Sequence, residues 1–229
     1  MNLLAAYFSA GAPLTDVSAA ALRDFLARWY VEKACTSKSS DSNAAERDTP
    51  STVTADSRLA SREHAKSDQV PAPHEMLDSL ARFLGWAEQQ TGLDLVSQAL
   101  PIFAELHESL PRALELTDSL WSWLRDRGGA FTFPEFLTSF EEGGHGQYDI
   151  DAPGTVGAIE GFFRIVRVQG TLVEAEELVS EARIWPIIFP AEVVARLDEG
   201  YIVNLELARA RQGWQIAGCG FAYPPGTDV

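Results

Sequence analysis

Residues 201–209 read YIVNLELAR, and their pattern indicates the fold class of the C-terminal part of the chain. Positions 203, 205 and 207 hold valine or leucine and are expected on one face, whereas positions 202, 204 and 206 hold isoleucine, asparagine and glutamate and are expected on the other. This alternation with a period of two is typical of a strand that buries one of its faces. The chain keeps this character from Gly154 onward, which predicts a β-region there.

Five segments of the β-region have strand character: residues 159–168, 171–174, 184–189, 201–209 and 214–221. Gln169-Gly170 and Gln212-Gly213 supply the glycine that tight hairpins need. Five short strands of this kind predict a small, partly closed antiparallel barrel of SH3 or OB size. A two-layer α+β sheet is the alternative that the pattern leaves open.

Before Gly154 the spacing of apolar residues is helical. Two segments have apolar residues three and four positions apart, which predicts two amphipathic helices. Their stripes are Leu22, Phe25, Leu26, Trp29 and Tyr30 in the first, and Met76, Leu77, Leu80, Phe83, Leu84 and Ala87 in the second. Asp16 or Ser18 can cap the first helix, and Gly92 closes the second. Trp86 lies beside the second stripe and is expected in the core.

Residues 36–72 separate the two stripes and differ from both in composition. This segment has no aromatic residue and only scattered valine and leucine. It cannot bury enough apolar surface to offset the entropy that ordering it would cost. We therefore interpret it as a disordered insertion.

The chain between the second stripe and the β-region is predicted to be helical but interrupted. Pro101 marks one break, and Ser109 with Pro111 marks a fresh start, because proline removes a helix hydrogen bond. Residues 132–135 read TFPE, a capping box that starts a further helix, and Phe136 joins its buried stripe.

The predicted organisation is α+β with two domains. An all-α domain covers residues 1–150 and contains the disordered insertion at 36–72. A small antiparallel, barrel-like domain of SH3 or OB size covers residues 154–229.

Charge and composition narrow the classes of protein. The chain has 33 acidic residues against 18 lysines and arginines, a net charge of −15. That balance opposes broad, non-specific binding to nucleic acid or to an anionic membrane. The sequence contains no run of about 18 apolar residues that could span a bilayer, and no basic residue precedes its mildly apolar start as in a secretory signal. We therefore expect a cytoplasmic protein.

Motifs for catalysis or metal binding are missing from the sequence. It has no H-E-x-x-H or C-x-x-C spacing, no P-loop and no G-x-S-x-G elbow. One glycine-rich loop carries His145, Asp149 and Asp151, and we interpret it as a polar hinge. Cys219 is expected to be a small buried hydrophobe. We predict no enzyme activity, no cofactor and no metal.

The β-region contains two pairs of arginines and one group of glutamates. Two arginine pairs are local positive spots where a phosphate could bind: Arg164 with Arg167, and Arg209 with Arg211. Four glutamates are expected to form a solvated face: Glu174, Glu176, Glu177 and Glu181.

The strongest candidate for an interaction surface is the apolar run IWPIIF at residues 184–189. Its proline disfavours a central strand, so the run is predicted to be an edge strand or a bulge. Edge strands normally carry charge or are covered, and this run carries no charge. Either the chain itself covers Trp185, Ile187 and Phe189, or a partner does.

From these features we expect a non-catalytic protein-binding or assembly protein that takes a protein partner or associates with itself. An acidic surface suits a basic partner. The alternative is a nucleic-acid-associated accessory protein that uses the small barrel, because such barrels often bind single strands.

Overall fold

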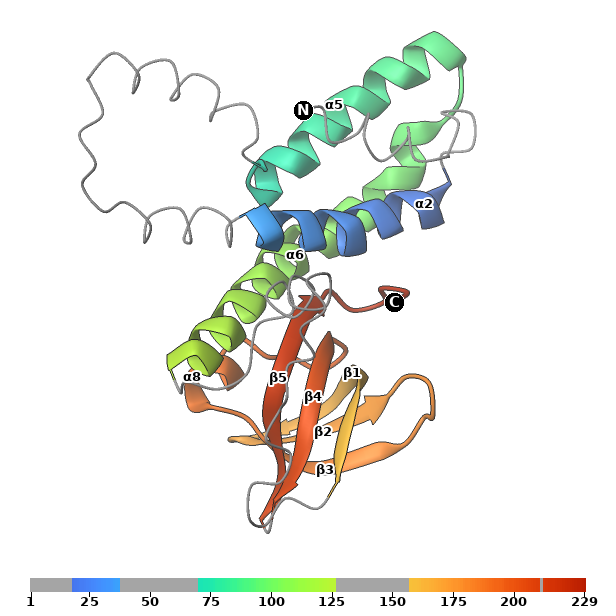
Figure 1. The fold of residues 1–229 in the computed structure, drawn as a ribbon. Coiled ribbons are helices and arrows are strands. Elements are labelled where there is room, and N and C mark those ends of the chain that lie inside the picture. The colour runs from blue at the N-terminus through green and yellow to red at the C-terminus, as the bar shows by residue number, and fades with distance from the viewer. Residues whose placement is uncertain (1–17, 38–69, 127–156, 211) are drawn as a thin grey trace, which may run out of the picture. The chain divides into compact units, whose positions relative to one another are not determined.

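The computed structural model describes residues 18–37, 70–126, 157–210 and 212–229 (Figure 1). Helices occupy the described chain before residue 127, and a five-stranded sheet with one short helix follows. The predicted mixture of a helical region and a β-region is confirmed. The predicted capping box at 132–135 and the loop with His145, Asp149 and Asp151 lie outside the described residues.

The chain divides into two compact units, Met1–His107 and Glu108–Val229. The division falls within helix α6 (Leu95–Asp126), so the last part of that helix belongs to the unit that contains the sheet. The domain boundary predicted between residues 150 and 154 lies among residues that the structure does not describe, and it stays a prediction.

The described part of the first unit is helical. Its N-terminal helix comprises α2 (Ala19–Asp24), the π-helical turn η2 (Phe25–Trp29) and a continuation over residues 30–37. Ser18, one of the two predicted caps, accepts a hydrogen bond from the Ala21 N–H at 3.1 Å. Helix α5 (Pro73–Thr91) ends at Gly92 as predicted, and the φ of 71° at Gly92 is the left-handed conformation that glycine favours.

Both predicted apolar stripes of this unit contribute to its core. Their buried members are Leu22, Phe25, Leu26 and Tyr30 in the first, and Met76, Leu77, Leu80, Leu84 and Ala87 in the second. The prediction that Trp86 lies in the core is wrong, because 56% of its surface is exposed. One step along a helix turns the side chain by about 100°, which carries Trp86 away from the face of Ala87.

The described ends of the predicted insertion belong to the helical unit. Residues 36 and 37 continue the first helix, and the Tyr30 hydroxyl donates a hydrogen bond to the Pro71 carbonyl at 2.6 Å. Structured chain therefore reaches further into the predicted 36–72 segment than expected at both ends. Residues 38–69 lie outside the described part of the chain.

Helix α6 shows that the predicted breaks at Pro101 and Pro111 are wrong. The helix runs through both prolines from Leu95 to Asp126. Each proline removes one hydrogen bond and crowds the carbonyl four residues earlier, but the rest of the ladder remains. Buried residues recur at helical spacing on both sides of the prolines: Ala99, Ile102, Leu106, Leu110, Ala113 and Leu114. This apolar packing outweighs the local cost.

The described part of the second unit contains five strands: β1 (Ala158–Gln169), β2 (Leu172–Glu177), β3 (Arg183–Ile188), β4 (Ile202–Ala210) and β5 (Gly213–Tyr223). Their hydrogen-bonded order is β1-β2-β3-β5-β4, and β4 also pairs with β1, so the pairings close into a ring. Four pairings are antiparallel, as predicted, whereas β3 and β5 pair in parallel. A parallel pair needs a long crossover, which here includes the short helix α8 (Ala191–Val194) and β4.

The alternation that predicted the strands separates buried from partly exposed side chains. Val203, Leu205 and Leu207 on β4 are fully buried, whereas Asn204 and Glu206 between them are partly exposed. Ile202, predicted on the face of Asn204 and Glu206, departs from this alternation, because 1% of its surface is exposed. Apolar residues from the other strands join the same core: Phe163, Ile165, Val173, Ala175, Ile187 and Ile216.

The last part of α6 is attached to β5 by two hydrogen bonds. The Trp121 Nε1–H donates to the Gly220 carbonyl at 2.9 Å, and the Ala222 N–H donates to the Thr117 hydroxyl at 2.9 Å. The Trp121 ring also lies 5.7 Å from the Phe221 ring, measured between centroids. Because Trp121 and Thr117 are buried, these bonds satisfy polar groups that folding removes from water.

Candidate functional site

Trp185 reaches the surface at an irregularity in the pairing of β2 with β3. The register shifts between Val173 and Ala175, so that two residues of β3, Trp185 and Pro186, stand opposite Glu174. An extra residue in one strand bends it locally and re-aims a side chain. Trp185 is 40% exposed. Of the two predicted ways to accommodate the proline, the register shows the bulge. Edge character is present there too, because the described part of β3 pairs with β5 at Ile187 and Ile188, after the proline, and not at Trp185 or Pro186.

Of the three residues predicted as an interaction surface, the structure brings Trp185 alone to the surface. Ile187 is fully buried and Phe189 is 1% exposed. The Phe189 N–H donates a hydrogen bond to the Thr171 carbonyl at 2.9 Å, which ties the end of the run into the sheet. The chain itself thus covers Ile187 and Phe189. Of the three residues, Trp185 is the one that a partner could contact.

An arginine stacks on the exposed tryptophan. The Arg167 guanidinium carbon lies 5.1 Å from the centroid of the Trp185 ring, within the range of a cation–π interaction. The Nη2 atom of Arg167 is 2.8 Å from Oε2 of Glu174. A glutamate opposite the bulge therefore holds the arginine over the ring.

Arg167 and Glu174 belong to a larger array, the arginine–glutamate ladder: Arg164, Arg167, Glu174, Glu176 and Arg183. Arg183 lies 3.5 Å from Glu174 and 3.8 Å from Glu176, and Arg164 lies 3.2 Å from Glu176. The glutamate side chains are mostly buried, whereas about half of each arginine side chain is exposed. The ladder contains three arginines and two glutamates, so it is a local positive spot on an acidic protein.

The ladder revises the sequence interpretation of the glutamates. Glu174 and Glu176 were expected on a solvated face, but they bind the arginines of β1 and β3. Glu177 accepts hydrogen bonds from the Val179 and Ser180 N–H groups at 3.0 and 2.6 Å. Hydrogen bonds from the side chain and backbone of Ser180 lower the pKa of Glu177. Sequence spacing alone did not reveal the ion pairs of Glu174 and Glu176, because the arginine partners lie on other strands.

A second arginine–tryptophan pair lies at the hairpin between β4 and β5. Arg209 and Trp214 are cross-strand partners, and the Arg209 guanidinium carbon is 5.5 Å from the Trp214 ring centroid. Trp214 is half-buried and Arg209 is exposed. Arg211, its predicted neighbour in a phosphate-binding spot, lies outside the described residues.

The other ionisable groups that the structure describes in the second unit include a buried thiol and a pair of facing carboxylates. Burial raises the pKa of the Cys219 thiol, which opposes formation of the reactive thiolate. Glu206 lies opposite Glu160 across β4 and β1, and burial, followed by the charge of Glu160, raises the pKa of Glu206. Within the described ranges, no group of three or more histidines, cysteines and carboxylates is arranged to hold a metal ion.

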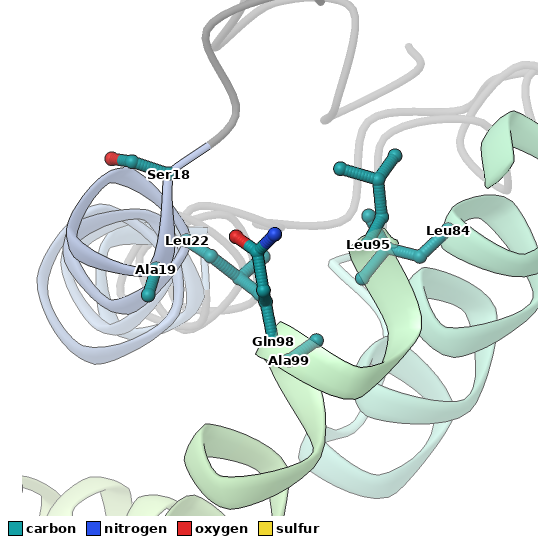
Figure 2. A pocket seen from close by; sticks show the side chains of 7 residues that line it. All are labelled: Ser18, Ala19, Leu22, Leu84, Leu95, Gln98 and Ala99. Atoms are coloured by element: carbon teal, nitrogen blue, oxygen red, sulfur yellow. The ribbon is translucent and has the colours of Figure 1, made fainter. Parts of the chain in front are cut away.

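The first unit contains a small pocket between α2, α5 and α6, which Figure 2 shows from close by. Its lining residues are Ser18, Ala19, Leu22, Leu84, Leu95, Gln98 and Ala99. The cavity volume is about 10 Å³, room for about one water molecule. It is too small for a substrate.

None of the helices in the described part of the chain is long and apolar enough to cross a membrane. Comparisons with protein-family models, with curated proteins and with solved structures found no match to this chain.

Proposed function

We propose that this chain is a non-catalytic binding or assembly protein that engages its partner through the surface around Trp185. The observation that carries the proposal is the Arg167 guanidinium stacked on the exposed Trp185 ring and held there by Glu174. Interface binding energy is concentrated in tryptophan and arginine more than in other residue types. An arginine that is already positioned loses less side-chain entropy when a partner binds.

A protein partner, or a second copy of the chain, is the first candidate. Trp185 supplies the anchor and the ladder supplies a charged rim around it, an arrangement common at protein interfaces. The proposal places the protein in the cytoplasm, where free cysteines such as Cys35 and Cys219 remain reduced.

A nucleic-acid-associated accessory protein is the second candidate, and the strand order favours it. We propose that the ring is a small barrel of SH3 or OB size; in OB barrels the face of strands two and three binds oligonucleotides. Trp185 lies on β3, opposite Glu174 on β2. Because the net charge is −15, nucleic acid would have to bind locally at the arginines.

Substitution of the exposed tryptophan tests the proposal. Tagged wild-type protein, Trp185→Ala and Trp86→Ala would be purified from the native cells, and the co-eluting protein and nucleic acid quantified with and without nuclease treatment. Trp86→Ala is the matched control, because it removes another exposed tryptophan from the other unit. We expect Trp185→Ala to lose at least about 80% of the partner, since an interface anchor contributes 1 kcal/mol or more.

Circular dichroism and thermal melting would establish that both variants remain folded. Retention of the same partner by folded Trp185→Ala contradicts the proposal. A nuclease-sensitive partner supports the second candidate, and a nuclease-resistant protein partner supports the first.

A further inference from the structure

Strand β3 has an open edge beside the arginine–glutamate ladder. Its pairing with β5 begins after Pro186, so before that residue its neighbour among the described strands is β2 alone. The Glu177 N–H donates a hydrogen bond to the Ala182 carbonyl at 2.9 Å. Bonded and non-bonded residue pairs alternate along an antiparallel ladder. Arg183, and Trp185 two positions later, therefore direct their N–H groups away from β2 and toward the open edge.

One row of the ladder ends at this edge on a positive charge. Arg164, Glu176 and Arg183 are successive cross-strand partners, so the charges alternate in sign from β1 to β3. Glu176 lies 3.2 Å from Arg164 and 3.8 Å from Arg183. The Arg183 side chain is 61% exposed, the largest fraction among the ladder arginines. Because opposite charges on facing strands attract, a strand added to this row would favour an acidic side chain.

The neighbouring row of the ladder ends at the same edge on an aromatic ring. Glu174 is the cross-strand partner of Arg167, and Trp185 stands across from it on β3, at the bulge. Aromatic side chains on facing strands stabilise one another. Arg183 and Trp185 are two residues apart, which is the spacing of side chains on one face of a strand. A single added strand can therefore satisfy both rows.

We propose that an extended, acidic segment of a partner protein adds to the open edge of β3 as a further strand. Its backbone bonds to Arg183 and Trp185, and it places a carboxylate beside Arg183 and an apolar side chain beside Trp185. Strand addition gains affinity from main-chain hydrogen bonds and specificity from alternate side chains. The chain as a whole has a net charge of −15, so an acidic segment is attracted at the ladder and repelled elsewhere. The inference rests on the first candidate function above and specifies the chemistry of its partner.

Amide chemical shifts of the isotopically labelled full chain test the inference. The probe is the capped pentapeptide ETFTE, whose glutamates and phenylalanine share one face and whose palindromic sequence suits either strand direction. We expect the peptide to shift the amide resonances of Arg183 and Trp185 on titration. The charge-reversed peptide KTFTK should bind at least about tenfold more weakly, because like charges repel. ETFTE methylated on two adjacent amide nitrogens should not shift these resonances, because one of any two adjacent amides faces β3.

Two variants test the side chains. Arg183→Gln should weaken the binding of ETFTE about two- to fivefold, the range for an exposed ion pair. Trp185→Ala should weaken it at least about fivefold, as expected for an interface anchor. Arg209→Gln removes an exposed arginine from the other hairpin and is the matched control, which should bind as the wild type does. Thermal melting would establish that each variant remains folded.

Equal binding of ETFTE and KTFTK, or undiminished binding of the methylated peptide, overturns the inference. So does the absence of any shift at Arg183 and Trp185 in the wild-type protein, or tighter binding of oligothymidine than of ETFTE. A wild-type dimer that dissociates in Trp185→Ala would assign the edge to a second copy of the chain and would also overturn the acidic segment. In each case, loss of the native partner from folded Trp185→Ala would still support the binding function proposed above.

Discussion

At the scale of single residues, the pair of Glu206 and Glu160 gives a pH-dependent prediction. Burial and the charge of Glu160 raise the pKa of Glu206. Because the folded-state pKa lies above the unfolded value, the stabilising contribution of this carboxyl is present at low pH and is lost as the pH rises through the folded pKa. Glu206→Gln should therefore stabilise the protein near pH 7 by roughly 0.2–1 kcal/mol, the size of a cross-strand repulsion between like charges.

Urea unfolding at about pH 7 and about pH 4 measures this effect. The gain should shrink at the lower pH, where the Glu206 carboxyl is protonated in the folded protein. Glu199→Gln, at an exposed position before β4, is the control and should change stability little at either pH. An equal gain at both pH values would show that ionisation of Glu206 is not the cause.

Trp185 shows what single-residue patterns can and cannot predict about the candidate site. The sequence identified the run around Pro186 as exceptional and offered a bulge as one explanation, which the register shows. It could not predict which of Trp185, Ile187 and Phe189 would be exposed. A bulge reverses the alternation of buried and exposed side chains, and the sequence does not show at which residue it does so. The Arg167 contact was also unpredictable, because it joins β1 to β3.

At the scale of elements, Thr117 connects helix α6 to strand β5. Its fully buried hydroxyl accepts a hydrogen bond from the Ala222 N–H at 2.9 Å and donates one to the Ala113 carbonyl at 3.0 Å. Valine has nearly the same shape but leaves the Ala222 N–H unsatisfied. Thr117→Val should therefore lower the free energy of unfolding by about 1–3 kcal/mol.

Thr117→Ser keeps the hydroxyl and should recover part of that loss. Ser119→Ala is the matched control, because the Ser119 hydroxyl donates to the Glu115 carbonyl within the same helix; it should cost less than about 0.5 kcal/mol. Chemical denaturation compares the three variants. If Thr117→Val and Ser119→Ala were equally mild, the hydrogen bond to β5 would not stabilise the unit.

Helix α6 also shows why element boundaries escaped prediction. The stripes ending at Tyr30 and Ala87 were long and regular, and both helices were found. Pro101 and Pro111 outweighed the pattern in the sequence interpretation, since a proline normally ends a helix. In the protein, buried residues such as Leu106 and Leu110 continue the apolar stripe between the prolines. The packing of this stripe outweighs the low helix propensity of the two prolines.

At the scale of the whole molecule, two patterns of apolar residues, the helical spacing and the two-residue alternation, were enough to predict a helical region followed by a β-region. They did not predict that residues 108–126 belong to the same compact unit as the sheet. One of the contacts between these segments joins Trp121 to Gly220, which are 99 positions apart, and such a contact leaves no periodic signal. Nor did they predict the parallel pairing of β3 with β5, because register between distant strands is a tertiary property.

Two fragments test where the sheet-containing unit begins. A fragment of residues 108–229 keeps Trp121 and Thr117, and also Ser109, whose carbonyl accepts a hydrogen bond from the Tyr201 hydroxyl at 3.2 Å. It should melt cooperatively and give dispersed amide resonances. A fragment of residues 154–229 leaves the Gly220 carbonyl and the Ala222 N–H without these partners and uncovers Phe221, so it should lack a cooperative transition and bind a hydrophobic dye. Equal stability of the two fragments would instead place the boundary at residue 154, as the sequence alone predicts.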